Sequence, residues 1–169
     1  PEPERLVYIG WNYGRGSSNS ETAYKFEYIR EHSRAFEGVS TERVWATELG
    51  AAEIPDEVRG LRVTEDFFRV VGIQPTLGRA FLPEEDVPGG ARVVVLSDEV
   101  WRSRYDAAPE ILGAVVRLGG EPYEVVGVMP PGFRVPERRG ATDFIVPFQL
   151  EVDPRDGGMN YRIRARVRP

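Results

Sequence analysis

Three consecutive acidic residues, Glu84, Glu85 and Asp86, are a candidate set of oxygen ligands for Ca²⁺. The alternating acids and the central glycine of an EF-hand loop are missing, and three adjacent carboxylates cannot all point at one ion. We therefore expect one of these acids to pair with Arg79 or with a loop amide, and the others to be solvated.

The only histidine of the chain, His32, is a candidate general base. A general base needs a nucleophile or a carboxylate partner within hydrogen-bonding reach, and the sequence gives no such constellation. One imidazole also cannot build a zinc site. Because His32 continues a stripe of Tyr24, Tyr28 and Phe36 at four-residue intervals, the pattern predicts a histidine packed at the edge of the core.

Arginine occupies alternate positions near the end of the chain, at Arg162, Arg164, Arg166 and Arg168. Alternate residues of a strand share one face, so this stripe could bind phosphate or anionic lipid headgroups. It could equally be the solvent-exposed face of an amphipathic strand, neutralised by nearby Asp and Glu. The net charge of -5 favours the solvent-exposed interpretation.

Motifs for nucleotide binding and for nucleophilic catalysis are absent from the sequence. No G-x-G-x-x-G or P-loop pattern occurs, and neither Ser17 nor Ser97 lies in a G-x-S-x-G turn. The absence of cysteine excludes disulfides and thiolate metal sites. The sequence therefore predicts no catalytic, cofactor-binding or metal-binding residue, no cofactor and no enzymatic activity.

The composition is that of a globular chain rich in turns. Its 169 residues suffice for one sizeable core or for two small subdomains that share an interface. Gly 18 and Pro 14 exceed their usual share and indicate short elements. The acidic net charge argues against a nucleic-acid partner. No run approaches the roughly 18 apolar residues of a membrane span, and no signal peptide opens the chain.

A first helix is predicted to run to about Phe36. Ser18 and Glu21 have the spacing of a capping box before it, and Ser20 is a competing N-cap. Gly38 is placed as the glycine that ends the helix. The predicted apolar face of this helix carries Tyr24, Tyr28, Ile29, His32, Ala35 and Phe36.

Apolar and β-branched runs predict the strands. They cover 6–9, 44–49, 58–63, 92–96, 115–118, 123–128, 144–148 and 161–167. Gly119-Gly120 is the strongest hairpin signal. Two short helices are expected, one capped by Thr64 and closed by Gly72, the other capped by Ser97. Few helices among strands that pair locally predict an α+β fold with mixed, mostly antiparallel sheets.

The apolar face of the last predicted strand, 161–167, needs a core to pack against. We expect it to pack against the tyrosine-bearing face of the first helix. This arrangement predicts that the strand shares a sheet with residues 5–11 and lies away from the 115–128 hairpin.

An ordered series of motifs runs through the segment from Val58 to Val128. Its members are Thr64–Phe68, Gly78-Arg79-x-Phe81, Asp86, Val93–Ser97, Gly113 and Tyr123–Val128. This order resembles the MacB-type periplasmic core domain of bacterial ABC-transporter permeases, especially the orphan or duplicated permease type. The resemblance covers nearly the whole chain, and in that family the Gly78-Arg79-x-Phe81 and Asp86 elements recur as a structural signature.

The resemblance implies two subdomains. Residues 1–63 and 141–169 would form a porter-like α/β subdomain, and residues 64–140 a β-rich Sabre-like subdomain. Members of the family continue past the last strand into a further helix and strand before the membrane. The porter-like part is therefore expected to be incomplete in this chain, with either an exposed sheet edge or self-association through that edge.

The resemblance also implies the function. It places the domain on the periplasmic or extracellular side of a bacterial cell membrane, as a non-catalytic coupling and interaction module in transport or efflux. The implied partners are the transmembrane helices of the permease, an ATP-binding subunit, and a periplasmic adaptor or protein substrate, with no nucleic acid.

Two other functions fit the residues taken alone. The chain could be an envelope module that binds a small ligand or a glycan through exposed Trp11, Trp45 and Trp101. It could also be a hydrolase whose catalytic residues are dispersed along the sequence. A hydrophobic span encoded just upstream and several downstream would favour the permease.

Overall fold

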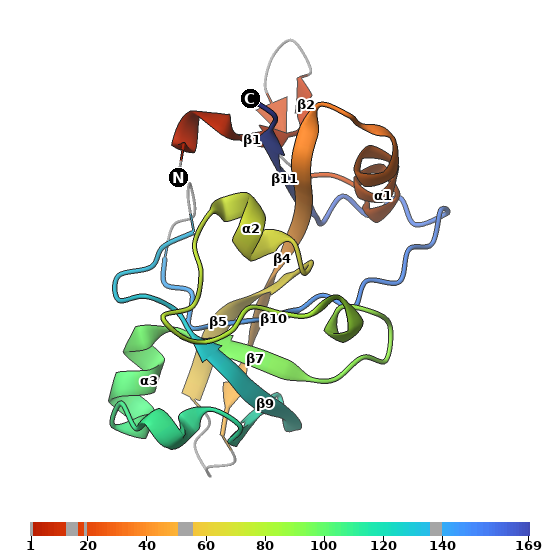
Figure 1. The fold of residues 1–169 in the computed structure, drawn as a ribbon. Helices are drawn as coiled ribbons and strands as arrows, with labels where there is room; N and C mark the ends of the chain where they lie inside the picture. Colours follow the sequence, from red (N-terminus) through yellow and green to blue (C-terminus); the bar gives the residue numbers. More distant parts are fainter. Residues whose placement is uncertain (1, 13–16, 19, 51–55, 136–139) are drawn as a thin grey trace.

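The computed structural model describes residues 2–12, 17–18, 20–50, 56–135 and 140–169. Figure 1 shows strands and a few short helices gathered around one long central strand, β4. The elements in chain order are η1 (Pro3–Arg5), β1 (Leu6–Ile9), β2 (Trp11–Asn12), β3 (Ser17–Ser18), α1 (Ala23–His32), β4 (Phe36–Leu49), β5 (Asp56–Val63), α2 (Phe67–Val71), β6 (Leu77–Gly78), η2 (Pro83–Glu85), β7 (Val93–Leu96), α3 (Asp98–Tyr105), η3 (Pro109–Ile111), β8 (Val115–Leu118), β9 (Glu121–Val128), β10 (Phe144–Pro147) and β11 (Arg162–Val167).

The strands form a nine-stranded mixed sheet with the order β1-β11-β4-β5-β10-β7-β9-β6, while β8 pairs with both β4 and β9. Strand β10 is parallel to β5, and β7 is parallel to β9; the other pairings in this sheet are antiparallel. The predicted α+β class with mixed, mostly antiparallel strands is confirmed. Strands β2 and β3 form a separate two-stranded ribbon.

Strand β4 replaces the end of the predicted first helix. Helix α1 is capped by Thr22, whose side chain accepts a hydrogen bond from the Lys25 amide at 3.2 Å, and it ends at His32. Phe36 begins β4, and Gly38 pairs with Arg166 of β11 instead of ending a helix. The predicted helix boundaries are therefore wrong at both ends, because pairing with β11 holds 36–42 in an extended conformation.

The two ends of the chain share one edge of the sheet. Strand β1 pairs antiparallel with β11, with Leu6 opposite Arg166 and Ile9 opposite Ile163. Figure 1 shows both termini at the end of the molecule that also carries α1, remote from β9. The predicted placement of 161–167 beside the first strand is confirmed.

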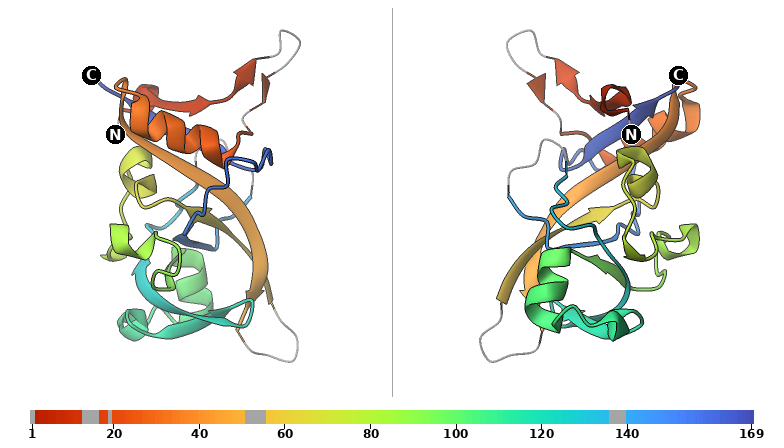
Figure 2. Two further views of the ribbon diagram at one scale, coloured as in Figure 1. Left: turned by 90° about the vertical axis from the view of Figure 1, so that its right-hand side faces the viewer. Right: turned by 60° about the vertical axis from the view of Figure 1, so that its left-hand side comes forward.

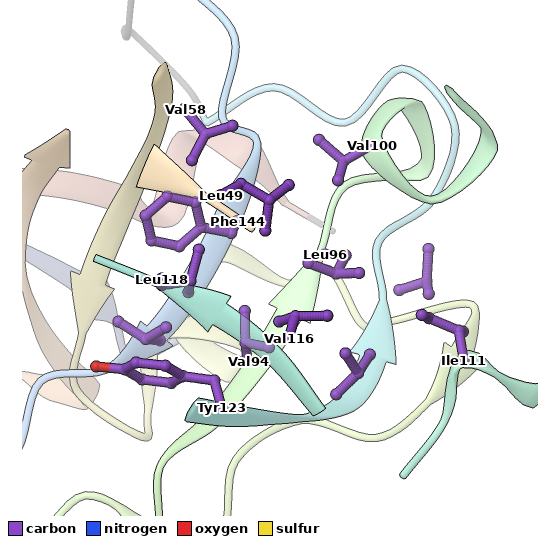
Figure 3. Packing of buried hydrophobic residues seen from close by; sticks show 13 residues of the cluster. Leu49, Val58, Val94, Leu96, Val100, Ile111, Val116, Leu118, Tyr123 and Phe144 are labelled. Carbon is purple, nitrogen blue, oxygen red and sulfur yellow. The ribbon is translucent and has the colours of Figure 1, made fainter. Parts of the chain in front are cut away.

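The central strands are buried on both faces. One core contains alternate residues of β7 and β10 and the inner side of α3; Figure 3 labels Leu49, Val58, Val94, Leu96, Val100, Ile111, Val116, Leu118, Tyr123 and Phe144. The intervening residues, such as Val95 and Ile145, join a second core with Phe67 and Phe68 of α2. Continuous apolar runs such as Val93–Leu96 are the sequence pattern of strands covered on both sides.

A third core lies beneath α1. Phe26 is fully buried against Val39, Ile163 and Ala165, and Ile29 packs at its margin. Figure 2 shows α1 lying along β4 with its other side facing away from the sheet. The apolar residues of β11 thus pack under α1 as predicted, but against Phe26 and not against the tyrosines.

Turn and cap predictions are mostly confirmed. Gly119 and Gly120 have φ angles of 59° and 82°, as a primed two-residue turn between β8 and β9 requires. Ser97 caps α3 by accepting a hydrogen bond from the Val100 amide at 3.1 Å, and Gly72 closes α2 with φ 79°. Thr64 does not cap α2 with its side chain, because its hydroxyl bonds to Ser40 and to the amide of Thr41 in β4.

Candidate functional site

The acidic loop, which carries Glu84, Glu85 and Asp86, pairs with Arg79 through one of its acids, as predicted. The Arg79 guanidinium donates to both carboxylate oxygens of Glu85, at 2.9 and 2.6 Å, and the Leu82 amide donates to the same carboxylate at 2.8 Å. Burial raises the pKa of Glu85, but these hydrogen bonds outweigh burial and hold that pKa below its usual value. Glu85 is therefore a structural anion that folds the loop onto Arg79.

Asp86 is a second structural anion, so the prediction that only one of the three acids is engaged and the others are solvated is wrong for Asp86. Its two carboxylate oxygens accept the amide N–H of Glu65 at 2.9 Å and that of Gln149 at 2.8 Å. Of the three acids only Glu84 is exposed. The loop fastens the start of α2 to the segment after β10, and no group of acids, histidines or cysteines among the described residues could hold a metal ion.

A cleft of about 280 Å³ separates α1 from the acidic loop. Glu65 and Asp86 line it from one side, and Glu27 and Arg30 of α1 line it from the other. Burial, the neighbouring Asp66 and then Asp86 raise the pKa of Glu65 to about 7. Burial also raises the pKa of Asp86. The cleft therefore contains a carboxyl group that changes charge near neutral pH.

Two arginines of the predicted stripe are buried, so the solvent-exposed interpretation is wrong for them. The side chains of Arg164 and Glu42 are 0% and 1% exposed, and two hydrogen bonds of 2.7 and 2.9 Å join them. Arg164 also stacks over the Tyr8 ring at 4.3 Å. Arg166 donates to the carbonyl of Val70 at the end of α2.

Arg164 and Arg166 therefore form a buried polar layer in contact with α2 and with the neighbouring strand β1, and these two residues are not a surface for phosphate or lipid headgroups. Arg162 is exposed at the start of the strand. Arg168 is exposed beyond the end of the strand, where its side chain donates to the carbonyl of Arg34. Neutralisation by a neighbouring acid, which the sequence pattern predicted, is confirmed for Arg164 in the form of one buried pair.

His32 lies on the surface, which corrects its predicted packing at the edge of the core. Its ring stacks on Tyr28 with centroids 4.4 Å apart and 16° between the planes. Tyr24 and Tyr28 are 52% and 54% exposed. The buried face of α1 is the one with Ala23 and Phe26, so the four-residue stripe is the outward face of the helix.

This outward face forms one wall of a groove that sequence reasoning missed. The groove has a volume of about 480 Å³ and is lined by Glu21, Thr22, Tyr24, Lys25, Tyr28, Gly157 and Met159. The signal was present as the Tyr24–Tyr28 spacing, but that spacing is also typical of a core face. Proximity to Met159, more than a hundred residues away in sequence, has no local signal.

The tryptophans proposed as ligand platforms are largely engaged in packing. Trp45 packs edge-on against Phe144, with ring centroids 5.4 Å apart, and the Arg62 guanidinium lies over the Trp45 ring, 4.3 Å from its centroid. The Trp101 indole N–H donates to the carbonyl of Ala108 at 2.9 Å. The side chain of Trp11 lies outside the described residues.

The groove beside α1 offers an exposed surface for contact with a partner. The charged groups with defined geometry, such as Glu85 with Arg79 and Glu42 with Arg164, neutralise each other within the fold. Among the helices in the described part of the chain, none has the length and apolar character needed to cross a bilayer.

Comparison with known proteins identifies relatives of the whole chain. A family model described as the MacB-like periplasmic core domain matches residues 2–169. The periplasmic region of MacB from Actinobacillus actinomycetemcomitans is similar, with 18% identity and a TM-score of 0.68, over 96% of this chain and 73% of that one.

The extracellular domain of the noncanonic ABC-type transporter YknZ from Gram-positive bacteria is also similar. It has 18% identity and a TM-score of 0.67, over 97% of this chain and 82% of that one. Among curated proteins none matches the chain. At these identities the two structures establish a shared fold, while the family match covers the described residues from one end to the other.

Proposed function

The chain belongs to the family of MacB-like periplasmic core domains, which are extracytoplasmic domains of ABC-transporter permeases. We propose that it is a non-catalytic coupling and interaction module. In this role the domain would pass movement driven by cytoplasmic ATP hydrolysis to a partner outside the membrane, in transport or efflux. The family match over residues 2–169 carries this proposal.

We further propose that the porter-like part consists of residues 1–63 and 141–169 and the Sabre-like part of residues 64–140. The cores around Phe26 and around Phe148 support this division, because all their members come from the porter-like ranges. The two larger cores mix residues of β5 and β10 with residues of 64–140. The two proposed parts thus share one sheet, so a movement of one part relative to the other would twist the strands that they share.

The proposed partners are the transmembrane helices of the permease, an ATP-binding subunit, and a periplasmic adaptor or protein substrate. The mutual neutralisation of the Glu85–Arg79 and Glu42–Arg164 pairs supports a role in binding without chemistry. The exposed outward face of α1 supports contact with a partner outside the membrane.

A cross-link across the cleft between α1 and the acidic loop tests the coupling role. Glu27 and Val87 line this cleft from opposite proposed parts, and the chain has no native cysteine. Full-length permease carrying Glu27→Cys and Val87→Cys, assembled with its ATP-binding subunit, would be placed in lipid nanodiscs and cross-linked with a reducible bis-maleimide. We expect ATP hydrolysis to fall on cross-linking and to recover on reduction.

Each single-cysteine variant, treated with the same reagent, is the matched control. Hydrolysis that continues at the uncross-linked rate in the doubly substituted, fully cross-linked permease would show that the two parts need not move against each other. The coupling role as proposed here would then be wrong.

A further inference from the structure

The groove beside α1 combines an apolar wall with a buried acid. Tyr24 and Tyr28 stand one helical turn apart on its helical side, and Met159 faces them from the segment before β11. Met159 is 40% exposed, so all three side chains present apolar surface to solvent. Tyrosine and methionine are enriched in protein interfaces because they bury a large area with few constraints.

The acid that lines the groove is incompletely satisfied. Glu21 is 1% exposed, and its Oε1 atom accepts a hydrogen bond from the Lys25 ammonium group at 2.7 Å. Its Oε2 atom has no hydrogen-bond partner. Buried carboxylate oxygens without a partner are rare in folded proteins. An incoming N–H donor would supply the missing hydrogen bond to this carboxylate. To admit the donor, the long, flexible Lys25 side chain would have to move aside.

The chain segment that supplies one wall of the groove is acidic. The segment that carries Gly157 and Met159 contains Glu151, Asp153 and Asp156 but a single basic residue, Arg155. Arg155 is paired with Asp153. Lys25 balances the charge of Glu21, so the excess negative charge near the groove comes from this segment, and it favours a positively charged occupant.

We propose that this groove binds an extended segment of a partner polypeptide that presents a lysine or arginine between apolar residues. The cationic head would donate to Glu21 Oε2, and the flanking apolar side chains would lie against Tyr24, Tyr28 and Met159. A polypeptide suits the site because two tyrosines spaced one turn apart provide adjacent contacts for successive side chains of one strand. This inference rests on the proposed role as an interaction module and names the chemistry of the partner.

The test uses purified full-length permease and a fluorescein-labelled peptide, Gly-Ser-Leu-Arg-Leu-Ser-Gly, followed by fluorescence anisotropy. A second probe replaces the arginine with citrulline, which keeps the shape and removes the charge. We expect saturable binding of the arginine peptide and about tenfold weaker binding of the citrulline peptide. Tyr28→Ala should weaken the arginine peptide about tenfold, as loss of an aromatic anchor does.

Two variants sharpen the result. Val115→Ala changes an exposed residue of β8, outside the groove, and should leave the affinity within about twofold. Glu21→Gln should make the arginine and citrulline peptides bind alike. If that variant does not fold, Tyr28→Ala and the two peptides still decide the question.

Three results would overturn the proposal. The first is absence of saturable binding by the arginine peptide, and the second is equal affinity for the two peptides on the unmodified permease. The third is concentration-dependent self-association of the isolated chain that Tyr28→Ala abolishes and the peptide does not inhibit; a second copy would then be the occupant. Peptide affinity is independent of the cross-linking readout, so failure of the groove and failure of the coupling role are distinguishable.

Discussion

Removal of the buried carboxylate of Glu42 should destabilise the domain strongly. The Glu42→Ala variant leaves the Arg164 guanidinium, which is 0% exposed, without the two hydrogen bonds of 2.7 and 2.9 Å that neutralise it. Breaking a buried ion pair in this way costs about 3–5 kcal/mol. Because typical domains have unfolding free energies of about 5–15 kcal/mol, this loss is a large share of the total.

An exposed ion pair provides the matched control for this prediction. Glu57 and Arg59 are 67% and 70% exposed and lie 3.3 Å apart, so Glu57→Ala should cost less than about 1 kcal/mol. The double variant Glu42→Leu with Arg164→Met should recover most of the stability lost in Glu42→Ala, because both charges of the pair are removed.

Urea denaturation followed by tryptophan fluorescence measures these differences, with an unchanged slope against urea confirming that the variants unfold alike. If Glu42→Ala and Glu57→Ala lower the unfolding free energy by the same amount, to within about 1 kcal/mol, the argument from burial is refuted.

Three further predictions concern the Gly78 turn, the cleft and metal ions. In Gly78→Ala the new Cβ would lie 2.1 Å from the Val126 carbonyl oxygen, at a φ of +74°, whereas a Cβ at Gly89, which has a φ of +77°, would meet no atom within 4 Å. Urea denaturation should show that Gly78→Ala lowers the unfolding free energy by about 3 kcal/mol or more and Gly89→Ala by about 1 kcal/mol. Equal losses would contradict the steric explanation. Burial, Asp66 and Asp86 raise the pKa of Glu65 from 4.5 to about 7, so the folded state binds this proton more tightly than the unfolded state. The wild type should therefore gain stability relative to Glu65→Gln as the pH falls from about 7 to about 5. If the difference in unfolding free energy between the two proteins does not change with pH, the pKa of Glu65 is not raised. Addition of EDTA should leave the melting temperature unchanged, and a drop of several degrees would revive the acidic loop as a Ca²⁺ site.

The sequence predicted those elements whose pattern is local. Strand β7 follows from its unbroken β-branched run, and the β8–β9 hairpin follows from Gly119-Gly120, because a turn with two positive φ angles excludes most other residues. Helix α3 follows from Ser97 and the acids after it. In each case the residues that determine the conformation are neighbours in the chain.

The errors arose where a remote segment decides which face is buried. On α1 the stripe with Tyr24, Tyr28 and His32 and the stripe with Phe26 and Ile29 are both compatible with a helix. Tyrosine suits either core or surface, so only the position of β11 distinguishes the two. For the same reason the alternation in β11 could not reveal that α2 covers its arginines.

The candidate sites were predicted only in part, because their partners are distant in sequence. The Glu85–Arg79 pair spans six residues, and the prediction was that one of the three acids pairs with Arg79 or with a loop amide. Asp86 accepts from Gln149, 63 residues away, and Glu42 pairs with Arg164 at a separation of 122 residues. Nothing in the local pattern identifies either partner.

The pairing of β1 with β11 has a mechanical consequence. Because these strands are antiparallel and Leu6 lies opposite Arg166, the two ends of the chain leave the sheet side by side. A force that drew the ends apart would load the hydrogen bonds between β1 and β11 one after another, as in opening a zipper. A force applied along β4 would instead shear its long ladders with β11 and β5, loading many bonds at once. The domain is therefore compliant to separation of its ends and stiff along its length.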